Sequence, residues 1–202
     1  MSETVGNGIM LALLAAGQSR RFVNEDKLTA LLHGKMLGLH AAETLASVSF
    51  DHHVVIVSSA EHACAARWQD LGYKIVVNDR AVDGQSTSVA QAAHEATACH
   101  ASALCICLAD MPFITSLHMV KLSEAFQASG GGKVVASSDK GSAMPPVLFP
   151  SSQFATLKDI RGDQGAKRLL KTAHLVPEND GGLLDIDTLE ALEIENRKAP
   201  RT

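Results

Sequence analysis

Residues 11–27 of the chain read LALLAAGQSRRFVNEDK. The stretch begins as an apolar run and ends as a short loop with one glycine and the cationic side chains of Arg20, Arg21 and Lys27. A buried strand that leads into such a loop is typical of a nucleotide phosphate site, because backbone amides and cations then face an anionic ligand. The loop lacks the Gly-Lys-Ser/Thr ending of a Walker P-loop, and Gly17 stands alone where a dinucleotide fingerprint needs three glycines. The stretch therefore predicts phosphate binding but disfavours both P-loop hydrolysis and dinucleotide-dependent oxidation and reduction.

Length and composition indicate one globular unit. The chain has 202 residues, of which 46% are hydrophobic and 20% charged, so it can bury a core without disulfide or metal cross-links. We therefore expect a single domain over residues 1–202. A net charge of −4 argues against a nucleic-acid partner. Neither a secretory signal nor a membrane span is evident, which predicts a cytoplasmic protein with no membrane partner. The four cysteines form no C-x-x-C pair and the nine histidines are scattered, so we expect free thiols and surface or strand-edge histidines.

Apolar runs and helical patterns alternate along the chain, which predicts an α/β fold with a single doubly wound, mostly parallel sheet. Residues 141–149 contain adjacent prolines, and we expect an antiparallel edge strand there because proline cannot donate to a sheet ladder. The other expected strands are 9–14, 54–57, 73–77, 103–108, 133–137 and 183–186, and the expected helices are 37–46, 61–71, 86–99, 116–128, 162–172 and 188–196.

Polar segments follow three of these strands. Residues 15–27 come after the first strand, residues 83–88 after the third, and Asp110 after the fourth. Ligands of open α/β sheets bind beyond the carboxyl ends of the strands. The three segments are therefore predicted to converge on one site.

The first loop is the predicted phosphate-binding element. Amides near Gly17 and Ser19, together with Arg21 and Lys27, would neutralise a triphosphate and the charge that develops on a transferred phosphorus. Lys27 opens the apolar stretch 28–32, which would hold its backbone still. Lys27 is thus the better candidate for a catalytic cation.

Carboxylates supply a candidate metal site. Asp110 ends a buried strand just before Met111 and Pro112, and a rigid carboxylate is a preferred ligand of Mg²⁺. Asp185 and Asp187 alternate on the expected strand 183–186 and its continuation, so both carboxylates would share one face. Helix capping is the alternative interpretation. Asp110 could cap the following helix, and one of Asp185 and Asp187 could cap the helix that begins near Thr188.

Small polar residues occur at two expected helix starts, GQSTS at 84–88 and GDQGA at 162–166. Such residues suit hydrogen bonds to a base or ribose, and Ser86 is a plausible N-cap. Helix capping alone is the alternative explanation for both segments.

Together these motifs resemble those of the molybdenum cofactor cytidylyltransferases and guanylyltransferases, within the wider nucleotidyltransferase superfamily. The resemblance extends from about residue 9 to residue 192. It is carried by LAAG at 14–17 with Ser19, Arg21 and Lys27, GK at 34–35, Gly84 with residues 86–89, LADMP at 108–112, PVLF at 146–149, GDQGA at 162–166 and DIDT at 185–188.

The resemblance implies a Rossmann-like nucleotidyltransferase that moves a nucleotide from an NTP to a phosphorylated, molybdopterin-type acceptor, with a molybdoenzyme as recipient of the product. It implies phosphate binding by Lys27 and Arg21, Mg²⁺ binding by Asp110, and a further contribution from Asp187 or Asp185. Alanine at position 16 is similar to the cytidylyl branch, which favours CTP. The expected nucleotide-binding residues are Leu14, Ala15, Ala16, Gly17, Ser19, Arg21, Lys27, Gly84, Ser86 and Ser88.

The sequence departs from the family pattern at four positions. Phe22 and Val23 replace the usual Met-Gly, Met36 stands where proline commonly follows Gly-Lys, and Leu189 stands where proline follows D-I-D-T. Loss of a glycine at Val23 restricts the approach of the backbone to phosphates. Phe22 and Val23 therefore keep open the alternative of a non-catalytic protein that binds and delivers the cofactor. Within the same chemistry, the alternatives are guanylyl transfer from GTP and transfer to a sugar or polyol phosphate.

Overall fold

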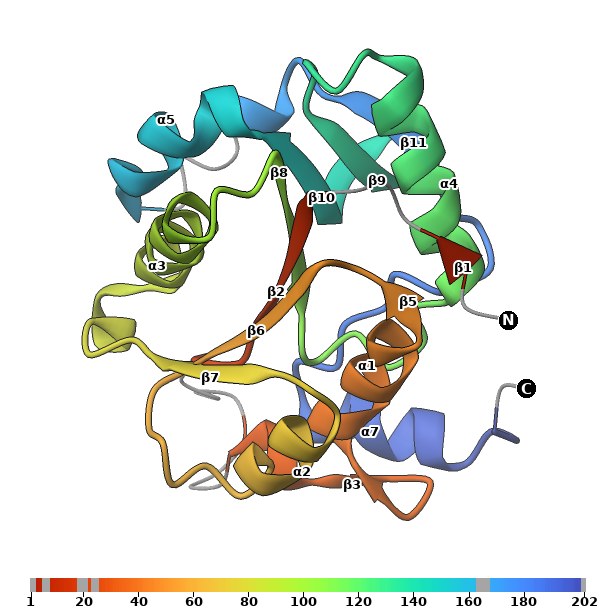
Figure 1. The fold of residues 1–202 in the computed structure, drawn as a ribbon. Coiled ribbons are helices and arrows are strands. Elements are labelled where there is room, and N and C mark those ends of the chain that lie inside the picture. Colours follow the sequence, from red (N-terminus) through yellow and green to blue (C-terminus); the bar gives the residue numbers. More distant parts are fainter. Residues whose placement is uncertain (1–2, 5–7, 18–21, 23–25, 163–167, 201–202) are drawn as a thin grey trace.

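The structure is a computed structural model that describes residues 3–4, 8–17, 22, 26–162 and 168–200. At its centre lies a seven-stranded sheet with the order β11-β9-β10-β8-β2-β6-β7 (Figure 1). Every neighbouring pair is parallel except the two that β10 makes with β8 and β9. The strands are β2 (Ile9–Leu14), β6 (His52–Val57), β7 (Lys74–Val77), β8 (Ala103–Leu108), β9 (Val135–Asp139), β10 (Ser142–Pro150) and β11 (His174–Pro177). The predicted fold class is confirmed.

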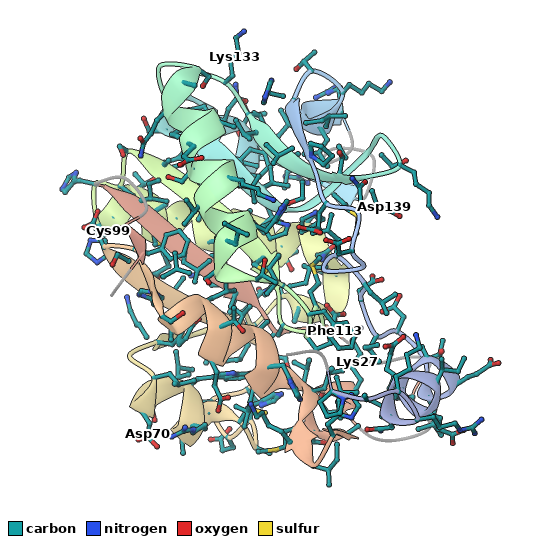
Figure 2. The ribbon with its side chains drawn as sticks, turned by 90° about the vertical axis from the view of Figure 1, so that its right-hand side faces the viewer. Lys27, Asp70, Cys99, Phe113, Lys133 and Asp139 are labelled. Carbon is teal, nitrogen blue, oxygen red and sulfur yellow. The ribbon has the colours of Figure 1, made fainter. Side chains whose placement is uncertain are left out.

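Helices cover both faces of the sheet, which explains why its central strands are apolar throughout. Alternate residues of β2 pack on opposite sides: Leu11 and Leu13 belong to the core beneath α1, α2 and α4, whereas Met10 and Ala12 belong to the core beneath α3 and α5. Figure 2 shows the first face, with α4 and α1 in front of the sheet. The helices are α1 (Leu37–Ala46), α2 (Ala65–Asp70), α3 (Gln85–Ala98), α4 (Ser116–Ala128), α5 (Phe154–Lys158) and α7 (Leu189–Asn196).

The antiparallel strand is not at the edge, which corrects the sequence-based expectation. β10 lies inside the sheet, between β9 and β8. Its two prolines, Pro145 and Pro146, fall where the register with β9 shifts between Met144 and Val147. Prolines are tolerated at such an irregularity because the residues there do not have to donate a backbone hydrogen bond to the neighbouring strand.

The C-terminal part differs from expectation in a second way. Residues 183–186 are not a strand, and the sheet instead ends with β11, which pairs with β9 in parallel. The closing helix α7 begins as expected, with the hydroxyl of Thr188 accepting the N–H of Ala191 at 3.1 Å. Of the helix expected at 162–172, residues 162 and 168–170 are helical and 163–167 lie outside the described residues.

Smaller elements complete the fold. The turn η1 (Lys27–Thr29) is followed by a hairpin of β3 (Leu31–Leu32) and β4 (Lys35–Met36), and β1 (Glu3–Thr4) pairs with β5 (Val48–Ser49). The turns η2 (Ala81–Asp83) and η3 (Ser151–Gln153) precede α3 and α5. All four cysteines are free thiols, as expected. Within the described ranges, no helix has the length and apolar character needed to cross a membrane.

Candidate active site

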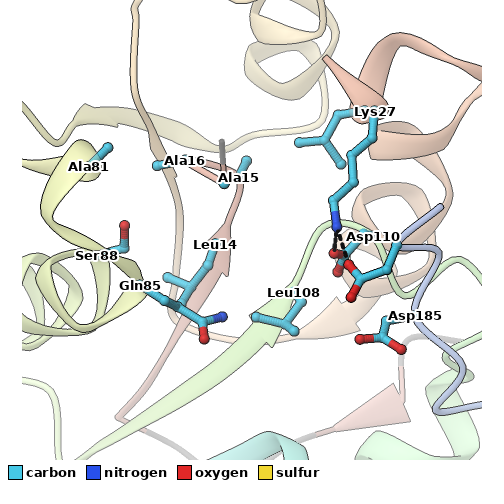
Figure 3. A pocket seen from close by; sticks show the side chains of 14 residues that line it. Leu14, Ala15, Ala16, Lys27, Ala81, Gln85, Ser88, Leu108, Asp110 and Asp185 are labelled. Atoms are coloured by element: carbon cyan, nitrogen blue, oxygen red, sulfur yellow. Dashed lines mark hydrogen bonds and ion pairs between the residues drawn. The ribbon is translucent and has the colours of Figure 1, made fainter. Parts of the chain in front are cut away.

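The predicted convergence at the carboxyl ends of the strands is present in the structure. A cleft of about 440 Å³ opens there, between the end of β2, the start of α3, the end of β8 and the segment before α7 (Figure 3). The size lies within the usual range for ligand pockets. Its described lining residues are Leu14, Ala15, Ala16, Gly17, Lys27, Leu28, Ala81, Gly84, Gln85, Ser88, Leu108, Asp110, Asp185 and Asp187.

The chain after β2 forms one wall of this cleft. The N–H of Ala15 donates to the carbonyl of Ile56 at 2.8 Å, which extends the pairing with β6 by one residue before the chain leaves the sheet. No atom of the described residues lies within 4 Å of where a side chain on Gly17 would begin, so with respect to them the backbone is open to a ligand. The predicted phosphate-binding residues Ser19 and Arg21, and the departure at Val23, lie outside the described residues.

The start of α3 forms the opposite wall. Gly84 has a φ of +110°, a conformation that favours glycine, and it turns the chain into the helix. The buried amide of Asn78 donates to the hydroxyl of Ser88 at 3.0 Å and so fixes the first turn. Gly84, Gln85 and Ser88 line the cleft, and Figure 3 shows the amide of Gln85 extending towards Leu14 and Leu108.

Ser86 does not line this cleft, contrary to expectation. It lies inside the first turn of α3 rather than at the N-cap, and its hydroxyl accepts the N–H of Gly162 at 3.1 Å. Gln85 takes the place in the cleft that was assigned to Ser86. The helical spacing could have revealed this, because Gln85 lies three residues before Ser88 and shares its face.

A backbone hydrogen bond brings the late aspartates to the end of β8. The N–H of Ile186 donates to the carbonyl of Asp110 at 2.9 Å, and the Ile186 side chain is fully buried with Phe22, Leu32, Leu37 and Leu192. Because Asp185 and Asp187 flank this buried residue, both line the cleft beside Asp110. Both carboxylates thus line one cleft, as the alternation predicted, although the segment is not a strand.

Lys27 joins the carboxylates. Its ammonium contacts Asp110 Oδ2 and lies 2.7 Å from Asp187 Oδ1 (Figure 3). The side chains of Lys27 and Asp110 are each 12% exposed, whereas that of Asp187 is 46% exposed. Burial lowers the pKa of Lys27, but the charge and hydrogen bonds of Asp110 and Asp187 outweigh it, so that the pKa is raised above 10.5. Lys27 therefore carries a full positive charge at neutral pH.

The same cleft carries an excess of negative charge. Burial raises the pKa of Asp185, and the nearby charges of Asp187 and Asp110 raise it further. Asp110 Oδ1 is buried and has no hydrogen-bond partner in the described part of the chain. An unpaired carboxylate oxygen beside two further carboxylates fits a divalent cation. No preformed group of three or more His, Cys, Asp or Glu ligands occurs among the residues that the structure describes.

A second cavity of about 400 Å³ adjoins the cleft and shares Leu14, Gln85 and Leu108 with it. Its walls are mainly apolar, and its remaining described lining residues are Ser86, Val89, Ile106, Ala143, Met144, Pro145, Val147, Phe149, Leu157, Gly162 and Leu170. Judged by their described lining residues, the cleft is charged and the adjoining cavity is uncharged.

The sheet order and the cleft at the strand ends are those of the Rossmann-like nucleotidyltransferase fold. The chain belongs to the family of MobA-like NTP transferase domains, whose model matches residues 11–178.

Two proteins of similar sequence support the assignment to this family. The chain is 33% identical to the "Purine catabolism protein PucB" of Bacillus subtilis over 199 residues, which cover 91% of this chain and 94% of that protein. It is 38% identical to the "Probable molybdenum cofactor guanylyltransferase" of Pyrococcus horikoshii over 71 residues, 35% of each chain.

A solved structure shares the fold. The crystal structure of Rv0371c from Mycobacterium tuberculosis superimposes with a TM-score of 0.77 at 18% identity, covering 98% of this chain and 100% of that one. A further structure of Rv0371c, in complex with manganese, matches with a TM-score of 0.70 at 16% identity over 95% of this chain and 99% of that one.

Proposed function

We propose that this nucleotidyltransferase moves CMP from CTP to the phosphate of a molybdopterin-type acceptor and releases pyrophosphate. The observation that carries the proposal is the Lys27 ammonium held between Asp110 and Asp187, at the edge of a cleft large enough for a nucleotide. A cation beside carboxylates at the strand ends is what transfer of a charged phosphoryl group requires.

The nucleotide is proposed to lie across the end of β2. Its base would sit against Ala16 and the residues 84–88, where the backbone and the side chains of Gln85 and Ser88 offer donors and acceptors. Its phosphates would extend along the open backbone at Gly17 towards Lys27. Arg21 remains a proposed phosphate ligand on the grounds of the sequence.

The chemistry needs no covalent enzyme intermediate. An acceptor phosphate oxygen forms a bond to the α-phosphorus of CTP while the bond from that phosphorus to the bridging oxygen of the β-phosphate breaks, and pyrophosphate leaves with the electron pair. Lys27 stabilises the negative charge that grows on the phosphates, and the fixed backbone at Asp110 and Ile186 holds the carboxylates in place. A divalent cation such as Mg²⁺, held by Asp110 with Asp187 or Asp185, would supply further charge neutralisation when bound.

The adjoining cavity supports a second, partly uncharged substrate. Walls made by Val89, Ile106 and Phe149 suit a flat ring system rather than a further phosphate. We place the ring portion of the acceptor there. The P. horikoshii relative, named "Probable molybdenum cofactor guanylyltransferase" and matched over 35% of this chain, supports a molybdopterin-type acceptor.

That relative also favours GTP as an alternative nucleotide. Both candidates are tested by measuring pyrophosphate release with each of the four NTPs, Mg²⁺ and molybdopterin, with identification of the product by mass spectrometry. The proposal expects a CMP adduct and a preference for CTP. A GMP adduct would replace the cytidylyl assignment, and nucleotide binding without pyrophosphate release would favour a cofactor-delivery protein.

A further inference from the structure

We propose that His62 is a positioning residue for the transfer reaction, acting through Asp26 to fix the backbone from which Lys27 reaches the carboxylates. The inference rests on the proposed function for the catalytic role of Lys27. His62 lies 35 residues further along the chain, in the loop between β6 and α2, and it does not line the cleft that holds Lys27.

Asp26 organises the short turn that carries Lys27. Its Oδ1 accepts the N–H of Leu28 at 3.0 Å, and its carbonyl accepts the N–H and the hydroxyl of Thr29 at 2.9 and 2.8 Å. A three-residue 3₁₀ turn has few hydrogen bonds of its own. The hydrogen bond from Leu28 to the Asp26 side chain therefore adds to the few bonds that hold the Lys27 backbone.

His62 holds the other oxygen of that carboxylate. Asp26 Oδ2 lies 2.6 Å from Nε2 of His62, and this close contact does not have the direction of a regular hydrogen bond. The Nδ1 of His62 accepts the N–H of Cys64 at 3.0 Å, which leaves the proton of the neutral ring on the Nε2 edge. The contact between this positive edge of the ring and the carboxylate is electrostatic.

The imidazole itself is fixed by packing. It stacks on the indole of Trp68, with ring centroids 4.7 Å apart and an interplanar angle of 30°, and the indole N–H donates to the carbonyl of Gly38 at 2.9 Å. Trp68 is fully buried and the His62 side chain is only 5% exposed, which corrects the expectation of a surface histidine. The buried core below α1 and α2 is thereby connected to Asp26.

The series of contacts from Trp68 through His62 and Asp26 leads to Lys27, whose position affects the rate of transfer. A displacement of about 1 Å at a catalytic group lowers turnover by roughly 10²-fold when the reacting geometry is lost. His62 needs no contact with substrate to influence the reaction, because it limits the movement of the Asp26 carboxylate.

The test compares His62→Ala with His62→Gln, whose amide places a donor near the former Nε2. The matched control is His40→Ala, which removes a partly buried imidazole whose Nε2 lies 3.0 Å from the carbonyl of Leu32. We expect His62→Ala to lower kcat by about 10-fold or more with KM for CTP within about threefold, and His62→Gln to recover most of the loss. His40→Ala should stay within about threefold of wild type on both parameters.

Hydrogen exchange of the Leu28 amide supplies a readout that does not depend on activity. His62→Ala should accelerate exchange at this amide, which donates to Asp26, by about 10-fold relative to the amides of β2, and His62→Gln and His40→Ala should not. In an Asp26→Ala background, His62→Ala should cause no further loss of kcat, because the two residues act in series.

Unchanged Leu28 exchange in folded His62→Ala, an equal loss of kcat in His40→Ala, or additive losses in the double variant would each overturn the inference. If the wild-type protein releases no pyrophosphate with any NTP, the proposed function fails. The Leu28 exchange then still decides whether His62 holds the Lys27 turn.

Discussion

Replacement of Lys27 by methionine tests the role of the buried ion pair. Methionine keeps most of the apolar stem but removes the ammonium, so Asp110 and Asp187 lose the cation that joins them. Asp185, whose pKa is already raised by burial and by these two carboxylates, would then face still less compensated negative charge. We expect a loss of stability and of turnover for the same electrostatic reason.

The size of the stability loss follows from the exposure of each contact. Removal of one partner from a buried ion pair costs about 3–5 kcal/mol, whereas an exposed pair contributes about 0–1 kcal/mol. Lys27 and Asp110 are each 12% exposed and lie near the first limit, while the contact with the 46%-exposed Asp187 lies near the second. We therefore expect Lys27→Met to lower the free energy of unfolding by about 3–5 kcal/mol, set mainly by the contact with Asp110.

The pH dependence has a defined sign. The pKa of Lys27 is raised in the folded state, so its stabilising contribution is fully present below the ordinary lysine value of 10.5 and is lost as the pH rises through the higher folded value. At neutral pH the wild type thus retains all of this contribution. In Lys27→Met the deficit should shrink at acidic pH, where protonation of the carboxylates relieves their repulsion.

The assay is urea denaturation at pH 7.5 with a chelator, together with pyrophosphate release. Lys35→Met is the matched control, since it breaks the ion pair between Lys35 and Glu43 on the surface, whose side chains are 42% and 29% exposed. The control should lose about 0–1 kcal/mol and keep its turnover, whereas Lys27→Met should lose kcat by about 10²-fold or more. Equal stability losses in the two variants, with activity preserved in both, would show that the ion pairs of Lys27 support neither the fold nor turnover.

Three further predictions concern the cleft. Asp110→Asn should keep the fold but lower turnover by about 10²-fold, as expected for a metal ligand, and near-normal kcat at saturating Mg²⁺ would remove Asp110 from the mechanism. Ala16→Gly should reduce the preference for CTP over GTP, which a few hydrogen bonds limit to about 1–3 kcal/mol. An unchanged preference in competition assays would show that Ala16 does not contribute to selection of the base. The pKa of Asp185 is raised by burial and by Asp187 and Asp110, so its ionised form opposes folding above the ordinary value of 3.8. Asp185→Asn should accordingly be more stable than wild type at pH 8 without metal and lose this advantage near pH 3, and denaturation curves that show the reverse order would contradict the assignment.

Much of the fold was predictable because its signals are local. The apolar runs at β2 and β8 predict buried central strands, and the same two runs place Gly17 and Asp110 at the carboxyl ends where ligands bind. The alternation of Asp185 and Asp187 around Ile186 placed both carboxylates correctly, because the buried isoleucine fixes their orientation even without a strand.

The remaining features depend on contacts between distant segments. The interior position of β10 follows from pairing on both sides of a strand whose prolines predicted an edge. Gln85, and not the predicted Ser86, lines the cleft. The Ser86 hydroxyl instead accepts a hydrogen bond from Gly162, which is 76 residues further along the chain. Likewise, no local pattern marks the contact between Asp26 and His62, because it forms only when the loop before α2 packs against η1.

A crystal structure with CTP and Mn²⁺ is the most direct test of the proposed site. We expect an anomalous Mn²⁺ peak about 2.0–2.2 Å from an oxygen of Asp110, with an oxygen of Asp187 or Asp185 in the same coordination sphere. We also expect the base against Ala16 and the start of α3, and the phosphates directed from Gly17 towards Lys27. Nucleotide bound elsewhere, or a metal that does not contact Asp110, would contradict the proposed site.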